Sequence, residues 1–254
     1  MDFKTILEHH LLDHTIARWP GVFGIEFALT KHLLMMWIVG TVLLLGLGFV
    51  ARSGRRLPLL RSLVEVLVIF VRDEVLGPAL GHAGRKYLPY FLSLFFFILL
   101  CNLSGLVPWG STATGNISVT ATLAGCTFFL IHIAGIREQG LGHYLKSIVP
   151  SGLPWWLIPI MIPIELIGFC TKAFALSIRL FANMIAGHIV ILAFLCLIFT
   201  FGAANPWTGF LAAPFSVMLA LFVYALEIFV AFLQAYIFTF LTALFVGAAV
   251  HPEH

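Results

Sequence analysis

Charged residues are scarce in this sequence. Asp, Glu, Lys and Arg make up 10% of its 254 residues, whereas 61% of the residues are hydrophobic. A water-soluble domain carries about 25% charged residues, so this chain lacks the polar surface that a soluble globule needs. The composition therefore predicts an all-α integral membrane protein.

Signatures of nucleotide and metal chemistry are also missing. The sequence contains no phosphate-binding glycine loop, no HExxH motif and no dinucleotide fingerprint. Its four cysteines all fall within apolar runs, which indicates small buried side chains and argues against a disulfide framework or a metal site. No cofactor, no metal and no nucleic-acid partner are expected. The cysteines are Cys101, Cys126, Cys170 and Cys196.

Apolar segments run through most of the chain, and we treat residues 1–254 as a single membrane domain with about five crossings. Residues 33–51 contain no charge and are long enough to span a bilayer. The next uncharged block is divided by turn residues into spans at 88–107 and 117–136. The blocks 155–201 and 210–250 each exceed a hydrocarbon core of about 30 Å at 1.5 Å per residue. Each of them must be steeply tilted, broken or folded back.

Residues 57–86 differ from the spans, because apolar and charged residues alternate there at helical spacing. Arg61 and Glu65 form an i,i+4 pair in this segment. The pattern is typical of an amphipathic helix at the membrane interface. A short hairpin entering the membrane is the alternative.

The basic residues predict the orientation of the chain. Nine of the fourteen Lys and Arg residues lie in 52–86 and 137–146, whereas the connections 108–116 and 202–209 have none. By the positive-inside rule, the basic connections are cytoplasmic. The N-terminal segment 1–31 is then expected outside, and the C-terminus inside.

The two long blocks contain the polar residues of interest. An arginine at a bilayer centre costs about 2.5–3.5 kcal/mol on insertion scales, yet Arg179 lies in an almost wholly apolar run. Glu165, Lys172 and Arg179 are seven residues apart, so on a helix they drift by only about 20° and share a stripe. Asn183 lies one helical turn beyond Arg179, and His188 lies on the opposite side of the same helix. The polar residues of the second block are Glu227, Gln234 and Tyr224.

Each of these residues alone has a structural explanation. Asn183 and Gln234 are typical of hydrogen bonds between membrane helices, and His188 can be a satisfied hydrogen-bonding residue. Lys172 can extend to the membrane surface, and Glu165 can pair with a basic neighbour. A buried salt bridge between Arg179 and Glu227 is a further alternative.

Together, the polar residues favour an ion pathway or a proton relay. His titrates near neutral pH, so His188 can exchange protons with the carboxyl group of Glu227. Arg179 stays protonated, which suits a fixed positive charge that faces an anion. The sequence offers no obvious carboxylate close to Arg179 on its own stripe, so we expect that anion on another chain.

The motif KAFALSIRLFANMIAGH, residues 172–188, resembles subunit a of the F-type ATP synthase. The family pattern is an arginine followed by Leu-Phe, Asn, Ala-Gly and a polar residue, and LEIFVAFLQAYIFTFLT, with Glu227 and Gln234, is a second match. Weaker matches are NLSGLVP at 102–108, Asn116, and PIELI with Glu165. Some bacterial members have Glu at the position of His188 and His at that of Glu227, which suggests that the two positions act jointly.

The resemblance implies a proton-translocating stator subunit with two long, steeply tilted helices against a ring of c subunits. Arg179 would meet the ionised carboxylate of each passing c subunit. His188, Glu227, Asn183 and Gln234 would belong to the outer half-channel, and Glu165 to the inner one; secondary candidates are Asn116, Lys172 and Tyr224. The implied partners are the c-ring, the b subunits of the peripheral stalk, the rest of the F1Fo complex and lipid. The chain would not be an enzyme by itself.

Other classes of protein fit less well. A self-contained ion-coupled secondary transporter would need internal repeats, which the sequence does not display. An intramembrane metalloprotease using His188 and Glu227 would lack the usual paired-histidine spacing, and a purely structural anchor would not need Arg179. We expect protons as the coupling ion, with sodium as the alternative. The expected location is a bacterial plasma membrane, with the mitochondrial inner membrane as the alternative.

Overall fold

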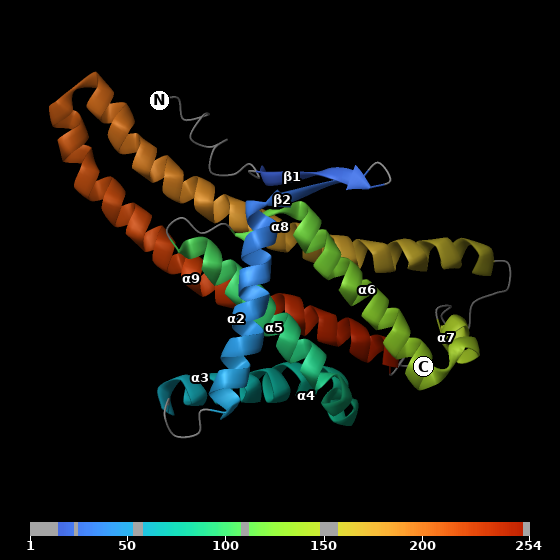
Figure 1. Ribbon diagram of the computed structural model, residues 1–254. Helices are drawn as coiled ribbons and strands as arrows, with labels where there is room; N and C mark the ends of the chain where they lie inside the picture. The colour runs from blue at the N-terminus through green and yellow to red at the C-terminus, as the bar shows by residue number, and fades with distance from the viewer. Residues whose placement is uncertain (1–14, 23–24, 53–57, 108–111, 148–156, 251–254) are drawn as a thin grey trace. The chain divides into compact units, whose positions relative to one another are not determined.

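The computed structural model describes the backbone of residues 15–22, 25–52, 58–107, 112–147 and 157–250 (Figure 1). Five of its helices are long and apolar enough to cross a membrane, in agreement with the predicted all-α membrane fold. The main helices are α2 (Lys31–Arg52), α3 (Pro58–Phe70), α5 (Gly84–Leu106), α6 (Ile117–Gln139), α7 (Leu141–Ser147), α8 (Ile158–Ala204) and α9 (Pro206–Val250).

A two-stranded antiparallel hairpin precedes the first span and was not predicted. Strand β1 (Thr15–Val22) pairs with β2 (Ile25–Thr30), and Thr15 lies opposite Thr30. The Thr30 hydroxyl accepts a hydrogen bond from the Leu33 N–H at 3.3 Å, which caps the start of α2. The predicted external segment 1–31 therefore contains regular structure, and its residues 1–14 lie outside the described part.

The described residues form two compact units. One draws on Met1–Val42, Ile98–Asn116 and Leu180–Gln234, and the other on Leu43–Phe97, Ile117–Arg179 and Ala235–His254. Both units thus combine segments that are far apart in the sequence. The assignment of residues 1–254 to a single membrane domain stays a prediction.

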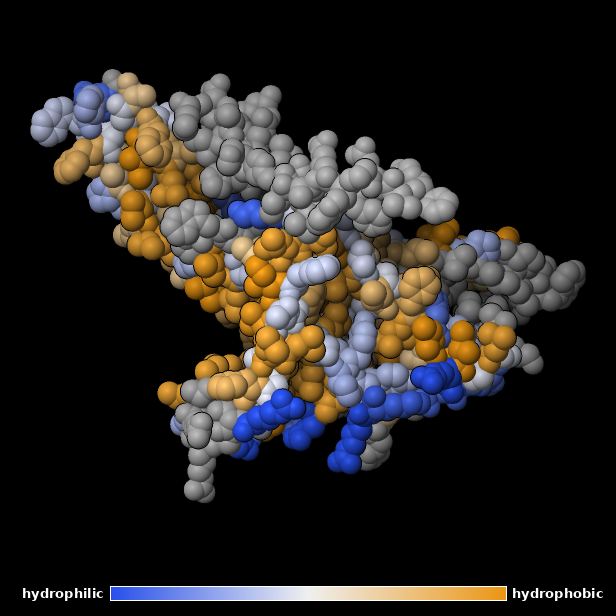
Figure 2. Space-filling model, viewed as in Figure 1, coloured by the Kyte–Doolittle hydropathy of each residue, from blue (hydrophilic) through white to orange (hydrophobic). Residues whose placement is uncertain are grey.

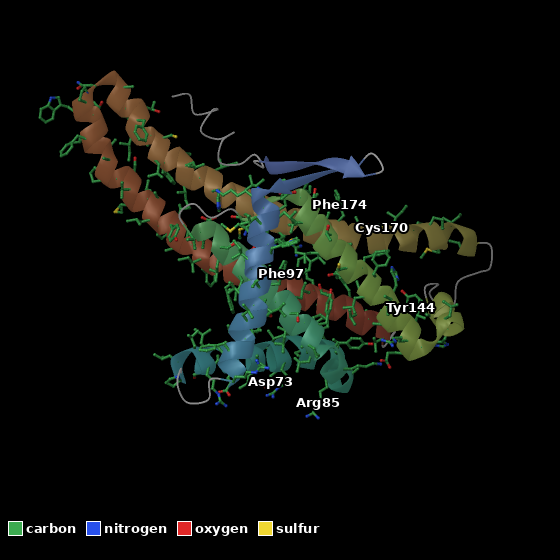
Figure 3. The ribbon with its side chains drawn as sticks, viewed as in Figure 1. Asp73, Arg85, Phe97, Tyr144, Cys170 and Phe174 are labelled. Atoms are coloured by element: carbon green, nitrogen blue, oxygen red, sulfur yellow. The ribbon has the colours of Figure 1, made fainter. Side chains whose placement is uncertain are left out.

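In the second unit, short helical segments connect α3 to α5. They are the π-helical η1 (Val71–Leu76), α4 (Gly77–Leu80) and the 3-10 segment η2 (Gly81–Ala83). No residue of α3 is buried, and Arg61 pairs with Glu65 on its exposed surface. Hydrophilic side chains gather along the lower edge of the view in Figure 2. Figure 3 shows Asp73 and Arg85 pointing away from the helices. An interfacial position for residues 57–86 stays a prediction.

The C-terminal end of α9 is held tightly within the same unit. The Gln139 side chain donates a hydrogen bond to the Ala249 carbonyl at 2.6 Å. A Cβ at Gly247 would collide with the backbone carbonyl of Ala79 in α4, so only glycine allows this approach. At the end of α6, Gly135 packs in the same way against the ring of Tyr144 in α7. These contacts fix the last turns of α9 to α4 and α6.

In the first unit, the C-terminal part of α8 and the N-terminal part of α9 form a hairpin with a very short turn, visible in orange in Figure 1. Asn205 alone separates the two helices, and its side chain accepts a hydrogen bond from the Trp207 N–H at 3.1 Å. Asn at the N-cap followed by Pro206 at the first helical position is a strong helix start. A Cβ at Gly209 would lie 2.6 Å from the Cα of Gly202, so glycine is needed where the helices meet.

All four cysteines are free. Only Cys101 is buried, whereas Cys126 and Cys170 are exposed and Cys196 is intermediate. The interpretation of the cysteines as buried side chains is therefore wrong for Cys126 and Cys170. Their apolar surroundings in the sequence reflect helix surfaces that face outward from the chain, as expected where lipid replaces a protein core.

Candidate functional site

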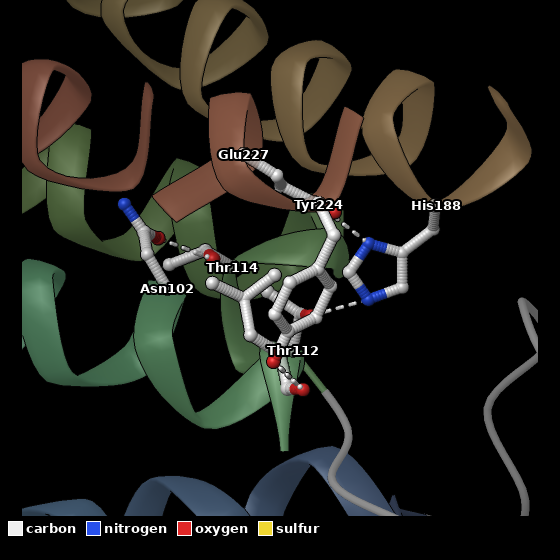
Figure 4. A network of polar contacts seen from close by, with 7 residues as sticks. Asn102, Thr112, Thr114, His188, Tyr224 and Glu227 are labelled. Carbon is white, nitrogen blue, oxygen red and sulfur yellow. Dashed lines mark hydrogen bonds and ion pairs between the residues drawn. The ribbon is translucent and has the colours of Figure 1, made fainter. Parts of the chain in front are cut away.

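His188 of α8 and Glu227 of α9 meet inside the first unit (Figure 4). The ring nitrogen Nδ1 of His188 lies 2.7 Å from Oε1 of Glu227. The side chain of Glu227 is only 4% exposed, whereas that of His188 is 30% exposed. A buried carboxylate needs a partner, and the imidazole supplies one that can also carry a proton.

Gly187, the neighbour of His188, makes room for this pair. A Cβ at Gly187 would lie 2.7 Å from Oε1 and 2.8 Å from Cδ of Glu227. Contacts below 3.0 Å force one of the groups to move. Glycine in the Ala-Gly pair of the motif thus has a local physical reason, because the carboxylate of Glu227 occupies the space that a side chain at 187 would take.

Thr112, which precedes the 3-10 segment η3 (Ala113–Gly115), contacts the other nitrogen of the same ring. Its Oγ1 lies 3.1 Å from Nε2 of His188, and the residue is 6% exposed. Gly105, in the last turn of α5, lies against the side chain of Thr112, which a Cβ at this glycine would hit. His188 is therefore held at both nitrogens, by Glu227 and by Thr112.

A second set of hydrogen bonds fixes the segment that carries Thr112. The Thr114 hydroxyl donates to the Asn102 side chain at 2.8 Å, and the Asn102 amide donates to the Ala231 carbonyl at 3.2 Å. Asn102 and Thr114 are fully buried. Nearby in Figure 4, the Tyr224 hydroxyl donates to the Leu106 carbonyl at 2.9 Å. These bonds connect α5, η3 and α9 in the first unit.

One carboxylate oxygen of Glu227, Oε2, is buried and has no hydrogen-bond partner among the described residues. A buried polar atom without a partner costs about 1–3 kcal/mol, so its presence calls for a functional explanation.

Arg179 is placed quite differently. It lies on the exposed surface of α8, between the buried Leu176 and Leu180. Within the described part of the chain, Arg179 makes no hydrogen bond and no ion pair. Arg179 and Glu227 belong to different compact units, so the structure does not test the alternative of a salt bridge between them.

The remaining sequence candidates are dispersed. Lys172 is exposed, with its ammonium group 5.4 Å from the centre of the Phe245 ring. Asn183 has a buried Nδ2 without a partner among the described residues, and Gln234 is 5% exposed. Asn116 is half-buried. Glu165 belongs to α8, and its side chain lies outside the described part of the structure.

Three residues of the polar network were missed in the sequence: Thr112, Thr114 and Asn102. The stretch STATGN at 111–116 consists of small and polar residues between two apolar spans, which indicates a turn, and only its Asn116 is a candidate from the sequence. Hydroxyl residues are common in turns, so nothing in the local pattern pointed to His188, 76 residues further along the chain.

Comparison with known proteins assigns the chain to a family. The family model described as "ATP synthase A chain" matches residues 33–247. The chain belongs to this family. Among relatives named ATP synthase subunit a, it is 48% identical to a protein of Chlorobium luteolum over 98% of this chain and 76% of the relative. It is 45% identical to one of Myxococcus xanthus over 92% of this chain and 78% of the relative.

Family membership settles the class of function. As a member of the subunit a family, the chain is a proton-translocating membrane subunit of the ATP synthase, and the alternative of a self-contained transporter is excluded. It is a multi-pass protein of the bacterial plasma membrane and part of the F1Fo complex.

Proposed function

We propose that Arg179 is the stator charge that faces the rotor. The observation that carries this proposal is an exposed guanidinium on a long apolar helix, with no counter-ion among the described residues. A cation in a membrane needs an anion, and the ionised carboxylate of a c subunit would supply it. Arg179 would then favour the deprotonated rotor carboxylate and block a direct proton leak between two half-channels.

His188 and Glu227 would form the proton-transfer pair of the outer half-channel. The support is their 2.7 Å contact and the buried Oε2 of Glu227, which has no partner among the described residues. Because an imidazole and a carboxylate in contact can pass a proton between them, the pair favours protons over sodium as the coupling ion. Asn183 and Gln234 would line the same half-channel.

The other candidates would have lesser roles. Glu165 would lie near the inner half-channel, and Asn116, Lys172 and Tyr224 would support the polar pathway without carrying protons themselves. Tyr224 is tied to the backbone of α5, which suits a structural role beside the pair.

The partners would be the c-ring on the side of Arg179 and the b subunits of the peripheral stalk, with lipid covering the remaining apolar surface. The N-terminus would lie outside and the C-terminus in the cytoplasm, following the distribution of Lys and Arg. The chain would have no catalytic activity of its own. One charge that crosses 100 mV releases about 2.3 kcal/mol. The energy of several protons must therefore be combined through rotation to make each ATP.

The variant Arg179→Ala tests this function in the whole complex. We expect ATP-driven proton pumping into inverted vesicles to fall to background, because the rotor carboxylate loses its fixed counter-charge. ATP hydrolysis by the detached soluble sector should continue, because this chain does not contact nucleotide. Arg179→Lys would test whether the positive charge alone is sufficient, because lysine keeps the charge but lacks the planar guanidinium.

Arg85→Ala serves as the control, because Arg85 is an exposed arginine at the start of α5 and belongs to neither long helix. Pumping should persist in that variant. Normal pumping by a fully assembled Arg179→Ala complex would refute the proposed role.

A further inference from the structure

We propose that Thr112 is a positioning residue for proton transfer, holding the His188 ring through its Nε2 atom. This inference rests on the proposed role of the His188 and Glu227 pair. The geometry consists of two contacts on one ring, 2.7 Å from Nδ1 to Glu227 and 3.1 Å from Nε2 to Thr112. An imidazole fixed at both nitrogens cannot turn away from the carboxylate.

The chemistry of a hydroxyl suits a ring that changes its charge. When His188 is neutral with its proton on Nδ1, that N–H donates to Glu227 and Nε2 accepts the Thr112 O–H. When His188 carries a second proton, Nε2–H donates to the Thr112 oxygen instead. A hydroxyl both donates and accepts by rotating about its C–O bond, so Thr112 holds the ring in either state.

The surroundings of Thr112 keep this hydroxyl in place. Its side chain packs against Gly105, where there is no Cβ. Two residues later, Thr114 bonds to the buried Asn102. A threonine side chain also has few rotamers. The hydroxyl is thus presented to Nε2 by a segment that is itself fixed.

The neighbouring Tyr224 does not hold Nε2 of His188. Tyr224 lies beside His188 in Figure 4, yet its hydroxyl donates to the Leu106 carbonyl. Glu227 contacts the ring only through Nδ1 in the described structure. Thr112 is therefore the side chain that the structure assigns to Nε2.

The test compares Thr112→Val with Thr112→Ser in the assembled F1Fo complex. Valine keeps the shape of threonine and removes the hydroxyl, so passive proton conduction through stripped membranes should fall about tenfold, the equivalent of one hydrogen bond to a charged group. Serine restores the hydroxyl and should restore most of the conduction. Rescue by serine would not occur if Thr112 merely filled space, since serine is the smaller residue.

Thr239→Val is the matched control. It also removes a buried threonine hydroxyl, but that hydroxyl bonds to the Ala235 carbonyl within α9 and not to His188 or to the segment that carries Thr112. Conduction per assembled complex should persist in this variant. Gly105→Ala provides a second variant, because the new methyl group would push the Thr112 side chain away; its conduction should fall as in Thr112→Val.

The outcomes separate this inference from the proposed function. Conduction that survives in His188→Gln would overturn the proton-transfer role of the pair itself. Loss of conduction in His188→Gln, with full conduction per assembled complex in Thr112→Val, would overturn only the role of Thr112. Failure of serine to improve on valine would also overturn it.

Discussion

Gly187 shows how one missing side chain shapes the candidate site. The carboxylate of Glu227 lies where a Cβ at this position would be, at 2.7 Å from Oε1. Because the same carboxylate contacts His188, the spacing of the whole pair depends on glycine at 187. The Ala-Gly step beside a polar residue is thus a packing requirement of the site.

We predict that Gly187→Ala lowers proton conduction about tenfold, because the added methyl group displaces Glu227 and weakens its bond to His188. Passive conduction in vesicles, normalised to the amount of assembled complex, measures this effect. Gly125→Ala on α6 is the control, since a Cβ there has nothing within 4 Å. Equal conduction in the two variants would contradict the prediction.

The sequence predicts that His188 and Glu227 act together, but it does not predict Thr112 as the third member of the site. His188 and Glu227 stand out because ionisable residues are rare in long apolar runs. Thr112 does not stand out, because a threonine in a turn is ordinary. Its position against Nε2 depends on how α5 and α8 pack, and no local pattern encodes that packing.

At the scale of elements, α9 is held firmly at its C-terminal end. Gly247 approaches the backbone of Ala79, and Gln139 bonds to the carbonyl of Ala249. A carbonyl in the last turn of a helix has no partner within the helix, so the Gln139 amide satisfies a group that would otherwise be unpaired. The end of α9 is therefore a fixed point of the second unit.

We predict that Gly247→Ala destabilises the protein by about 1–3 kcal/mol, because the methyl group overpacks a contact with rigid backbone. The thermal midpoint of the purified complex in detergent should fall accordingly. Gly46→Ala in α2 should leave the midpoint unchanged or slightly higher, since that position is open and alanine favours helix. An unchanged midpoint for Gly247→Ala would show that α9 is not held there.

Some elements follow directly from composition and others do not. The long apolar blocks led to helices because the bilayer demands hydrogen bonds within each segment. The β1–β2 hairpin was missed because Pro20, which argues against a strand, lies within the residues that form β1. The single-residue turn at Asn205 was also missed, since GAANPWTG contains enough turn formers for a longer loop.

At the scale of the whole molecule, the basic residues predict which side faces the cytoplasm. Arg137 lies in the last turn of α6, followed by α7. The α8–α9 turn at Asn205 has no Lys or Arg near it. The positive-inside rule therefore predicts that these two turns lie on opposite sides of the membrane.

We predict that a membrane-impermeant maleimide labels Trp207→Cys in intact cells, whereas Gly142→Cys is labelled only in inverted vesicles. Both positions are exposed. The four native cysteines are first replaced by alanine, because Cys126 and Cys170 are exposed as well. Labelling of Gly142→Cys from the outside would reverse the proposed orientation.

The closeness of Gly202 and Gly209 has a mechanical consequence. A turn made by one residue leaves no slack between α8 and α9, so neither helix can slide along the other near the tip. A sideways force on either helix near the turn is therefore transmitted directly to the other helix.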